Sequence, residues 1–231
     1  MPTLMTRYLF IALAASLMAA PAAAHHPGKK LDVMMGSREK YFQPIDKPAP
    51  AFSLQDADGR KVNLSDFQGK VVVLHFVYVS CGDVCPLHSD RIAEIQDMVN
   101  VSPSKEQVQF ITITTDPQKD TPEVLREYGP AHGLDAANWT FLTTLPGQPG
   151  DWTRRLAEAF GHTFTETPSG AQVHGVVTHV IDRQGLWRAN FHGLRFQSIN
   201  LVLYVNSLVN EGQHPAGAEA KSLWDRLRGL F

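Results

Sequence analysis

The chain has 231 residues, of which 43% are hydrophobic and 19% charged, and its formal net charge at pH 7 is −2. This length and composition favour one globular domain with a substantial core and exclude a disordered or fibrous chain. The near-neutral charge and the lack of a long basic run argue against nucleic acid as a partner.

The first 24 residues have the three parts of a secretory signal peptide. Arg7 supplies the positive charge, Leu9 to Ala20 the apolar segment, and small residues up to Ala24 a cleavage site. We expect cleavage after Ala24 and a periplasmic protein. The alternative is an uncleaved anchor over residues 8–24, whose apolar stretch is shorter than the roughly 20 residues that a membrane-spanning helix needs. In an oxidising compartment a cysteine pair forms a disulfide unless a metal or a reductant holds it.

Residues 25–48 are polar, are interrupted by Pro and Gly and show no sustained period, which predicts a flexible leader. The domain itself is predicted to span residues 49–210. It begins with a hairpin over residues 52–64, which turns at Asp58-Gly59, a pair typical of tight turns. Residues 71–79 form a near-continuous apolar run rich in β-branched and aromatic side chains, which predicts a strand buried on both faces.

The rest of the domain alternates between helical and extended patterns. The predicted elements are a helix over 86–100, a strand over 108–114, a helix over 121–128, a strand over 139–143, a helix over 151–160, an irregular excursion over 163–171, a hairpin with strands at 176–182 and 187–191, and a helix over 194–210. This order predicts an α/β fold, a thioredoxin-like three-layer sandwich with a mixed sheet and an N-terminal β-hairpin extension.

The C-terminal tail, residues 211–231, differs in character from the domain. A linker rich in Gly, Pro and Ala precedes a short amphipathic helix. Its apolar face consists of Leu223, Trp224, Leu227, Leu230 and Phe231. This helix is predicted to dock on the body of the domain, and the alternative is contact with a surface or a membrane.

The two cysteines of the chain, Cys81 and Cys85, directly follow the predicted strand over 71–79, and Pro86 suits the first turn of the next helix. They therefore lie at the carboxyl edge of the sheet, where open α/β sheets bind ligands. A structural disulfide, a redox dithiol and a soft-metal site are all compatible with this pair. A disulfide closing so short a loop would restrain little of the unfolded chain, and thioredoxin-type pairs have two intervening residues rather than three. Thiolates also select Cu(I) or Zn(II).

A metal held by two thiolates would take an imidazole as third ligand, and the chain has ten histidines. His174 stands at the start of the last hairpin, which a sheet can bring beside the cysteine loop. His179 lies an odd number of residues further along the strand and therefore faces the other side. Four other histidines are weaker candidates: His75 is expected in the core, His88 near the thiols, and His132 and His162 at the surface.

Four stretches resemble the Sco/SenC family: Ala49 to Leu54, Asp58-Gly59, Val77 to Pro86 and Thr115 to Pro122. The resemblance implies a thioredoxin-fold chaperone that delivers copper to the binuclear copper centre of cytochrome c oxidase. It also implies that copper is carried as Cu(I), with Cu(II) as an alternative.

Carried over by position, the resemblance implies that Cys81 and Cys85 are thiolate ligands, that His174 is the histidine ligand and that Asp116 lies near the site. The implied partners are the copper-bearing oxidase subunit and a copper donor chaperone or a thioredoxin-like reductase. Membrane contact through either terminal segment is a further expectation. His25 and His26 would form an accessory Cu(II) site if cleavage occurs after residue 24.

The alternative function is that of a thiol–disulfide oxidoreductase that keeps the cysteines of the oxidase copper site reduced. Thioredoxin-type reductases place a cis-proline opposite the dithiol, before the last hairpin. This chain has no proline between Ser169 and Gln213 and has His174 in that region. The sequence therefore favours a metallochaperone over an enzyme.

Overall fold

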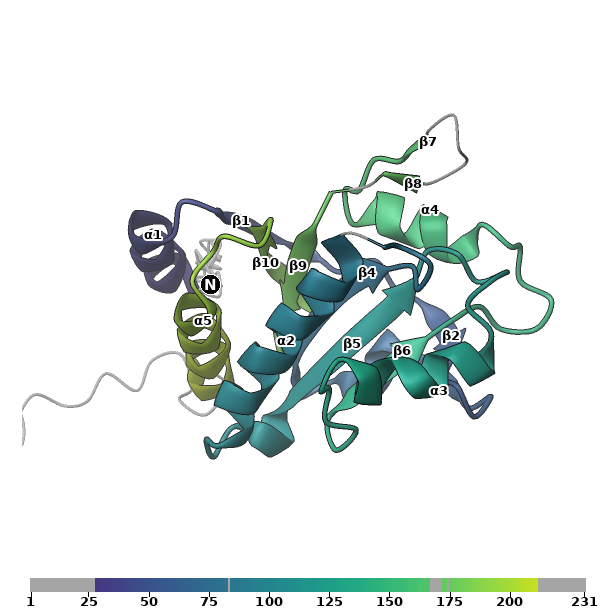
Figure 1. Ribbon diagram of the computed structural model, residues 1–231. Helices are drawn as coiled ribbons and strands as arrows, with labels where there is room; N and C mark the ends of the chain where they lie inside the picture. The colour runs from purple at the N-terminus through teal and green to yellow at the C-terminus, as the bar shows by residue number, and fades with distance from the viewer. Residues whose placement is uncertain (1–27, 83, 167–171, 174, 212–231) are drawn as a thin grey trace, which may run out of the picture.

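The structure, a computed structural model, describes residues 28–82, 84–166, 172–173 and 175–211 (Figure 1). Predictions for the signal peptide, for His25 and His26, for His174 and for the tail from residue 212 onward lie outside these residues. A six-stranded mixed sheet forms the middle layer, in the strand order β1–β10–β9–β4–β5–β6. Strand β4 is parallel to β5 and antiparallel to β9, and β5 is parallel to β6.

The bounds of the elements follow the chain. The strands of the main sheet are β1 Phe42–Pro48, β4 Val71–Val77, β5 Val108–Thr114, β6 Trp139–Leu142, β9 Val177–Ile181 and β10 Leu186–His192. Two small hairpins pair β2 Ser53–Gln55 with β3 Lys61–Asn63, and β7 Thr165–Glu166 with β8 Gln172–Val173. The helices are α1 Gly28–Arg38, α2 Val84–Asn100, α3 Pro122–Ala131, α4 Trp152–Ala159 and α5 Ser198–Glu211, with 3-10 turns η1 Leu64–Phe67 and η2 Lys105–Gln107.

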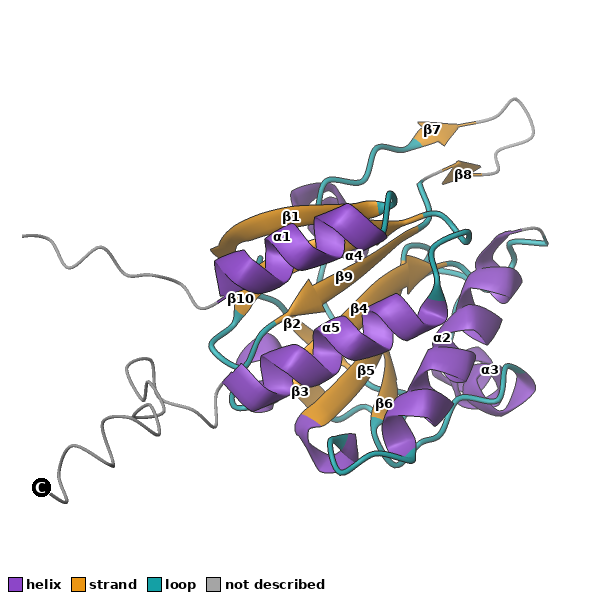
Figure 2. Cartoon of the chain, turned by 90° about the vertical axis from the view of Figure 1, so that its left-hand side faces the viewer, coloured by secondary structure: helices purple, strands orange, loops and turns teal. Residues whose placement is uncertain are grey.

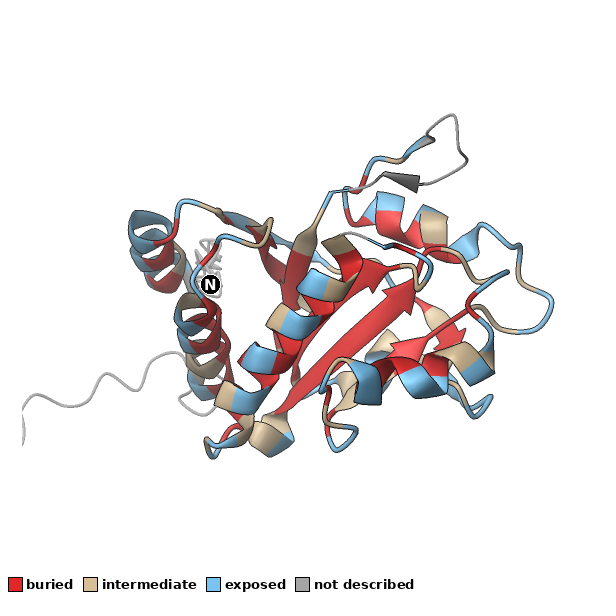
Figure 3. Ribbon diagram, in the orientation of Figure 1, coloured by how far each residue is buried: buried red, intermediate tan, exposed pale blue. Residues whose placement is uncertain are grey.

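Both faces of the sheet are covered, which confirms the three-layer sandwich with its N-terminal hairpin. Alternate residues of β4 enter different cores: Val71 and Val73 pack with α1, α2 and α5, while Val72 and Leu74 pack with α4 and the β2–β3 hairpin. All seven residues of β4 are buried, as are all seven of β5, and Figure 3 shows both strands buried throughout. A strand covered on both sides favours apolar residues on both faces, which explains the run in the sequence.

Residues 25–48 were predicted to be a flexible leader, and for residues 28–48 this prediction is wrong. They form α1 and β1, and β1 pairs antiparallel with β10 at the edge of the sheet. Their apolar anchors are few and widely spaced: Leu31, Met35 and Phe42 have exposed fractions of 6%, 1% and 9%. Pro44 is tolerated because an edge strand needs hydrogen bonds on one side only.

Helix α3 was predicted to end before Gly129, but it continues to Ala131. Gly129 serves packing rather than helix termination, because a Cβ added there would lie 2.2 Å from the ring of Trp139. Pro130 falls in the last turn of the helix.

A buried ion cluster joins α1, β10 and α5. Arg188 is 4% exposed, and its guanidinium lies 3.2 Å from the carboxylate of Asp182, 3.6 Å from that of Glu211 and 3.7 Å from that of Asp32. The Tyr204 hydroxyl donates to Asp32 Oδ1 at 2.7 Å. Burial raises the pKa values of Asp32 and Glu211. One cation thus lies within reach of three acidic groups, and Asp32 of the N-terminal helix contacts both this cation and the Tyr204 hydroxyl.

No helix in the described part of the chain is both long enough and apolar enough to cross a bilayer.

Candidate functional site

The two thiols lie where the central strand meets the second helix. Strand β4 ends at Val77, two residues earlier than predicted, because the chain turns and the Cys81 N–H donates to the Tyr78 carbonyl at 3.1 Å. Helix α2 begins at Val84, so Cys85 occupies its first turn. Neither cysteine is in a disulfide, and both are buried, with exposed fractions of 8% for Cys81 and 5% for Cys85.

Asp120 anchors the start of the cysteine loop from the neighbouring β5–α3 connection. Its carboxylate accepts a hydrogen bond from the Val79 N–H at 3.1 Å and another from the Thr114 hydroxyl. Asp120 is 2% exposed, and burial raises its pKa. The sequence contains Asp120 in the Asp-x-x-x-Asp-Thr-Pro run, but sequence reasoning selected Asp116 and missed it. A buried carboxylate that holds the backbone two residues before Cys81 is a positioning residue for the site.

The environment of Cys85 favours its protonated form. Burial, and after it a hydrogen bond with Cys81, raises the pKa of Cys85 to about 12. The first turn of a helix favours an anion, but this effect is smaller than the cost of burying a thiolate. That hydrogen bond also shows that the two sulfurs are neighbours. The two sulfurs can therefore bind one soft metal ion together or form a disulfide.

Aromatic side chains from α3 and β6 enclose the thiols. The cysteines share a buried cluster with Leu125, Tyr128 and Phe141, against which Trp139 packs. The Tyr128 hydroxyl lies 2.7 Å from Ser89 Oγ, and burial raises its pKa. A cavity of about 390 Å³ is lined by three members of this group. The full lining is Asp56, Ala57, Asp58, Arg60, Leu125, Arg126, Ala136, Trp139, Thr140 and Phe141.

His75 and His88 lie near each other on the α2 side of the sheet. His75 is fully buried, as predicted, and burial lowers its pKa to about 3. Its Nε2 lies 3.4 Å from Ser89 Oγ. His88, a weaker candidate ligand, is 2% exposed, and its Nε2 lies 2.9 Å from the Thr178 hydroxyl. The described contacts of both rings are those of core histidines.

His162 was predicted at the surface, and this prediction is wrong, because it is 5% exposed and pairs with His179. Their Nε2 atoms lie 2.9 Å apart. Asn190 Oδ1 accepts hydrogen bonds from the Trp187 indole at 2.8 Å and from His179 Nδ1 at 2.7 Å. The proton of His179 is therefore on Nδ1, and its Nε2 accepts a hydrogen bond from His162 Nε2. Both rings pack on the α4 side with Phe76, where the lone pair of His179 is already used.

The remaining predicted site residues are placed only in part. His174 lies outside the described residues, so its role as a ligand stays a prediction. Asp116 lies in the turn after β5, where its carboxylate pairs with Lys119 Nζ at 3.0 Å, and its place near the metal also stays a prediction. Within residues 28–82, 84–166, 172–173 and 175–211, no three His, Cys, Asp or Glu side chains form a group that could hold a metal ion.

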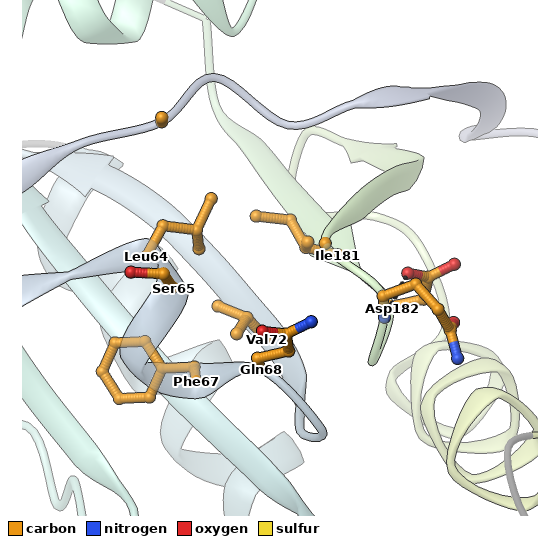
Figure 4. A pocket seen from close by; sticks show the side chains of 10 residues that line it. Leu64, Ser65, Phe67, Gln68, Val72, Ile181 and Asp182 are labelled. Carbon is orange, nitrogen blue, oxygen red and sulfur yellow. Dashed lines mark hydrogen bonds between the residues drawn. The ribbon is translucent and has the colours of Figure 1, made fainter.

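A second cavity, of about 250 Å³, lies at the opposite end of β4 from the cysteines. The side chains of Leu64, Val72 and Ile181 point into it (Figure 4). It has no thiol or imidazole in its lining, and its rim carries Asp182. Because of this position and lining, the cavity takes no part in the chemistry of the sulfurs.

The fold and site define a class of protein: a thioredoxin-like domain in which two neighbouring thiols follow the central strand. The model of the SCO1/SenC family matches residues 43–206, and the chain belongs to this family.

Curated relatives agree with this assignment. A SCO2-like protein of Rickettsia prowazekii is 35% identical over 143 residues, which are 61% of this chain and 67% of the relative. Protein sco1 of Schizosaccharomyces pombe is 33% identical over 124 residues, or 51% of this chain and 47% of the relative. The chain thus spans about half the length of some of the curated relatives it matches.

Solved structures share the fold. A SCO1/SenC family lipoprotein of Bacillus anthracis has a TM-score of 0.65 at 24% identity and covers 72% of this chain and 97% of its own. BsSco, described as a member of the Sco family of cytochrome c oxidase assembly proteins with a disulfide switch, has a TM-score of 0.63 at 22% identity, with coverage of 73% and 96%. Yeast Sco1 with copper bound has a TM-score of 0.57 at 19% identity, with coverage of 80% and 99%.

Proposed function

We propose that this protein binds copper through Cys81, Cys85 and His174 and delivers it to the copper-bearing subunit of cytochrome c oxidase. One observation carries the proposal: in a SCO1/SenC family domain, the two cysteines of the chain lie as neighbouring thiols directly after the central strand. The solved relatives from yeast and from Bradyrhizobium japonicum that contain copper support the choice of metal.

The chemistry of the donor set fits Cu(I). Two thiolates and one imidazole are soft to intermediate donors, which Cu(I) prefers over hard oxygen ligands. Thiol ligands must be deprotonated when they bind, so loading releases protons, including the one that burial retains on Cys85. Delivery then proceeds by ligand exchange, in which sulfurs of the partner replace Cys81 and Cys85 one at a time.

A copper titration tests the proposal. The reduced protein and its Cys81→Ser, Cys85→Ser and His174→Ala variants are titrated with Cu(I) against a chromophoric chelator of known affinity. We expect a single Cu(I) per chain, with affinity lost in the cysteine variants and lowered in His174→Ala. His192→Ala is the matched histidine control and should bind as the wild type does, because His192 contacts Gln43 on the edge strand. Equal binding by wild type and all site variants would reject the copper site.

The second candidate function is thiol–disulfide exchange, and the proximity of the two thiols favours it. In this reaction one thiolate attacks a partner's disulfide, and the second thiolate resolves the mixed disulfide. The protein ends with a Cys81–Cys85 disulfide, and the partner gains two electrons and two protons as two thiols. A dithiol reductase must then reset the pair. A reduced protein that binds no Cu(I) but reduces a disulfide peptide stoichiometrically would favour this function over copper delivery.

We also propose that the protein acts in the periplasm after removal of its first 24 residues. The charge, apolar segment and small residues of the N-terminus support this location. Mass spectrometry of the protein from a periplasmic extract tests it. An N-terminus at His25 is expected, whereas an intact Met1 in the membrane fraction would favour the uncleaved anchor.

A further inference from the structure

The outer surfaces of α1 and α5 carry exposed apolar side chains. Val33 and Met34 on α1 are 75% and 42% exposed, and Ile199 and Leu203 on α5 are 48% and 42% exposed. The two helices lie side by side on one flank of the domain (Figure 2), and the Asn200 amide on α5 donates to the carboxylate of Glu39, directly after α1, at 3.0 Å. We call this surface the α1–α5 face.

Exposed cations flank these apolar side chains. They are Lys29, Lys30, Arg38, Lys40 and Arg195, all exposed, in a chain whose formal net charge is −2. Arg195 and Lys40 both lie over the ring of Tyr41, at 5.8 and 4.8 Å from its centroid. The acidic groups of the two helices are directed elsewhere, because Asp32 and Glu211 pair with the buried Arg188. The charge that this face presents to a partner is therefore positive.

We propose that the α1–α5 face binds the surface of an anionic lipid bilayer. Apolar side chains that protrude from helices lying flat can enter the headgroup region, and flanking lysines and arginines attract anionic lipids. A protein partner would be expected to require shape and hydrogen-bond complementarity, whereas this face offers protruding apolar groups and cations.

The proposed orientation leaves the cysteine loop accessible. In Figure 1 helices α1 and α5 lie on the left flank, whereas the arrow of β5 points to the upper right. Strand β4 is parallel to β5, so the loop that follows β4 leaves the sheet on that same side. A domain resting on α1 and α5 would keep its two thiols on the aqueous side of the bilayer, within reach of a partner.

Vesicle sedimentation tests the proposal. The chain from His25 is used because it contains every described element and lacks the apolar N-terminal segment. It is mixed with vesicles of phosphatidylcholine alone or with added phosphatidylglycerol, at low and high salt. We expect binding only to the anionic vesicles, weakened by salt. Val33→Ser/Met34→Ser should reduce binding several-fold, and Lys29→Glu/Lys30→Glu should reduce it by roughly fivefold or more per cation.

Matched controls lie on other surfaces. Trp152→Ser removes an exposed apolar side chain from α4, and Lys61→Glu reverses an exposed cation on β3. Both should bind vesicles as the wild type does, and circular dichroism should show unchanged unfolding temperatures for all variants. The proposal is overturned if the wild type ignores anionic vesicles or if the face variants bind like the controls. It is also overturned if removal of residues 212–231 abolishes binding, or if the face variants instead dissociate a dimer.

Discussion

Removal of the Asp120 carboxylate should loosen the start of the cysteine loop. Asp120→Ala deprives the Val79 N–H and the Thr114 hydroxyl of their acceptor inside the protein. Hydrogen bonds to a charged group contribute about 1.5–3 kcal/mol each. Two such losses are partly offset because a buried charge is also removed, so we expect a net loss of about 2–4 kcal/mol in the free energy of unfolding.

The Asp120→Asn variant keeps the acceptor oxygen but removes the negative charge. Both hydrogen bonds go to one carboxylate oxygen, which Asp120→Asn retains, so its stability near neutral pH should lie within about 1 kcal/mol of the wild type. Burial raises the pKa of Asp120 above 3.8 in the folded state, so the folded protein holds this proton more tightly than the unfolded chain does. Ionisation of Asp120 therefore lowers stability as pH rises from about 3.8 through the folded-state pKa. The stability of Asp120→Asn relative to the wild type should increase over that window.

Urea unfolding at a series of pH values measures these effects, and a Cu(I) competition titration reports on the loop. Asp120→Ala should bind Cu(I) more weakly than the wild type, because the backbone before Cys81 is no longer held. For the unfolding measurements alone, the matched control is Asp116→Ala, which removes a partly exposed ion pair with Lys119 and should cost less than about 1 kcal/mol. Equal unfolding midpoints for Asp120→Ala and the wild type would refute this reasoning. So would an Asp120→Asn variant as unstable as Asp120→Ala.

Three further changes have defined outcomes. Arg188→Met leaves three acidic groups without their buried cation and should lower the free energy of unfolding, measured in urea, by about 3–5 kcal/mol. An unfolding midpoint near that of the wild type would show that the cluster is solvated. Gly129→Ala places a methyl group against the ring of Trp139 and should lower the free energy of unfolding by about 1–3 kcal/mol. The near-ultraviolet circular dichroism spectrum should change as well. An unchanged melting temperature would contradict the close packing of Gly129 on Trp139. In the Cys81→Ser variant, iodoacetamide at pH 8 should alkylate Cys85 much more slowly than it alkylates a cysteine peptide, because burial keeps the pKa of Cys85 well above the usual value. Equal alkylation rates would contradict this prediction.

The centre of the domain was predictable because its rules are local. The run over 71–79 identified β4, and two cysteines directly after a buried strand could only lie at the carboxyl edge of the sheet. The hairpin at Asp58-Gly59 was equally clear, and Gly59 adopts the positive φ of 77° that such a turn needs. In each case a few adjacent residues carry the whole signal.

Distant contacts determine the features that the sequence analysis missed. Residues 28–48 fold because β10 supplies hydrogen bonds and Arg188 supplies a charge partner, and neither leaves a periodic pattern in the segment itself. Gly129 and Pro130 resemble a helix break until the ring of Trp139 explains the glycine. His162 looked like a surface residue because its partner, His179, lies 17 residues away on a strand.

The candidate site likewise combines a local feature that the sequence predicts with contacts from distant segments. Cys81 and Cys85 are neighbours through one turn of chain, so their sequence spacing alone brings the sulfurs together. Asp120 reaches the loop only because β5 runs parallel to β4 and delivers the following connection to the same edge. A side chain from the segment before β9 would reach that edge for an analogous reason, since β9 lies on the other side of β4 and, being antiparallel to it, begins there. The topology therefore places the start of β9 at the same edge of the sheet as the cysteine loop, on the side opposite Asp120.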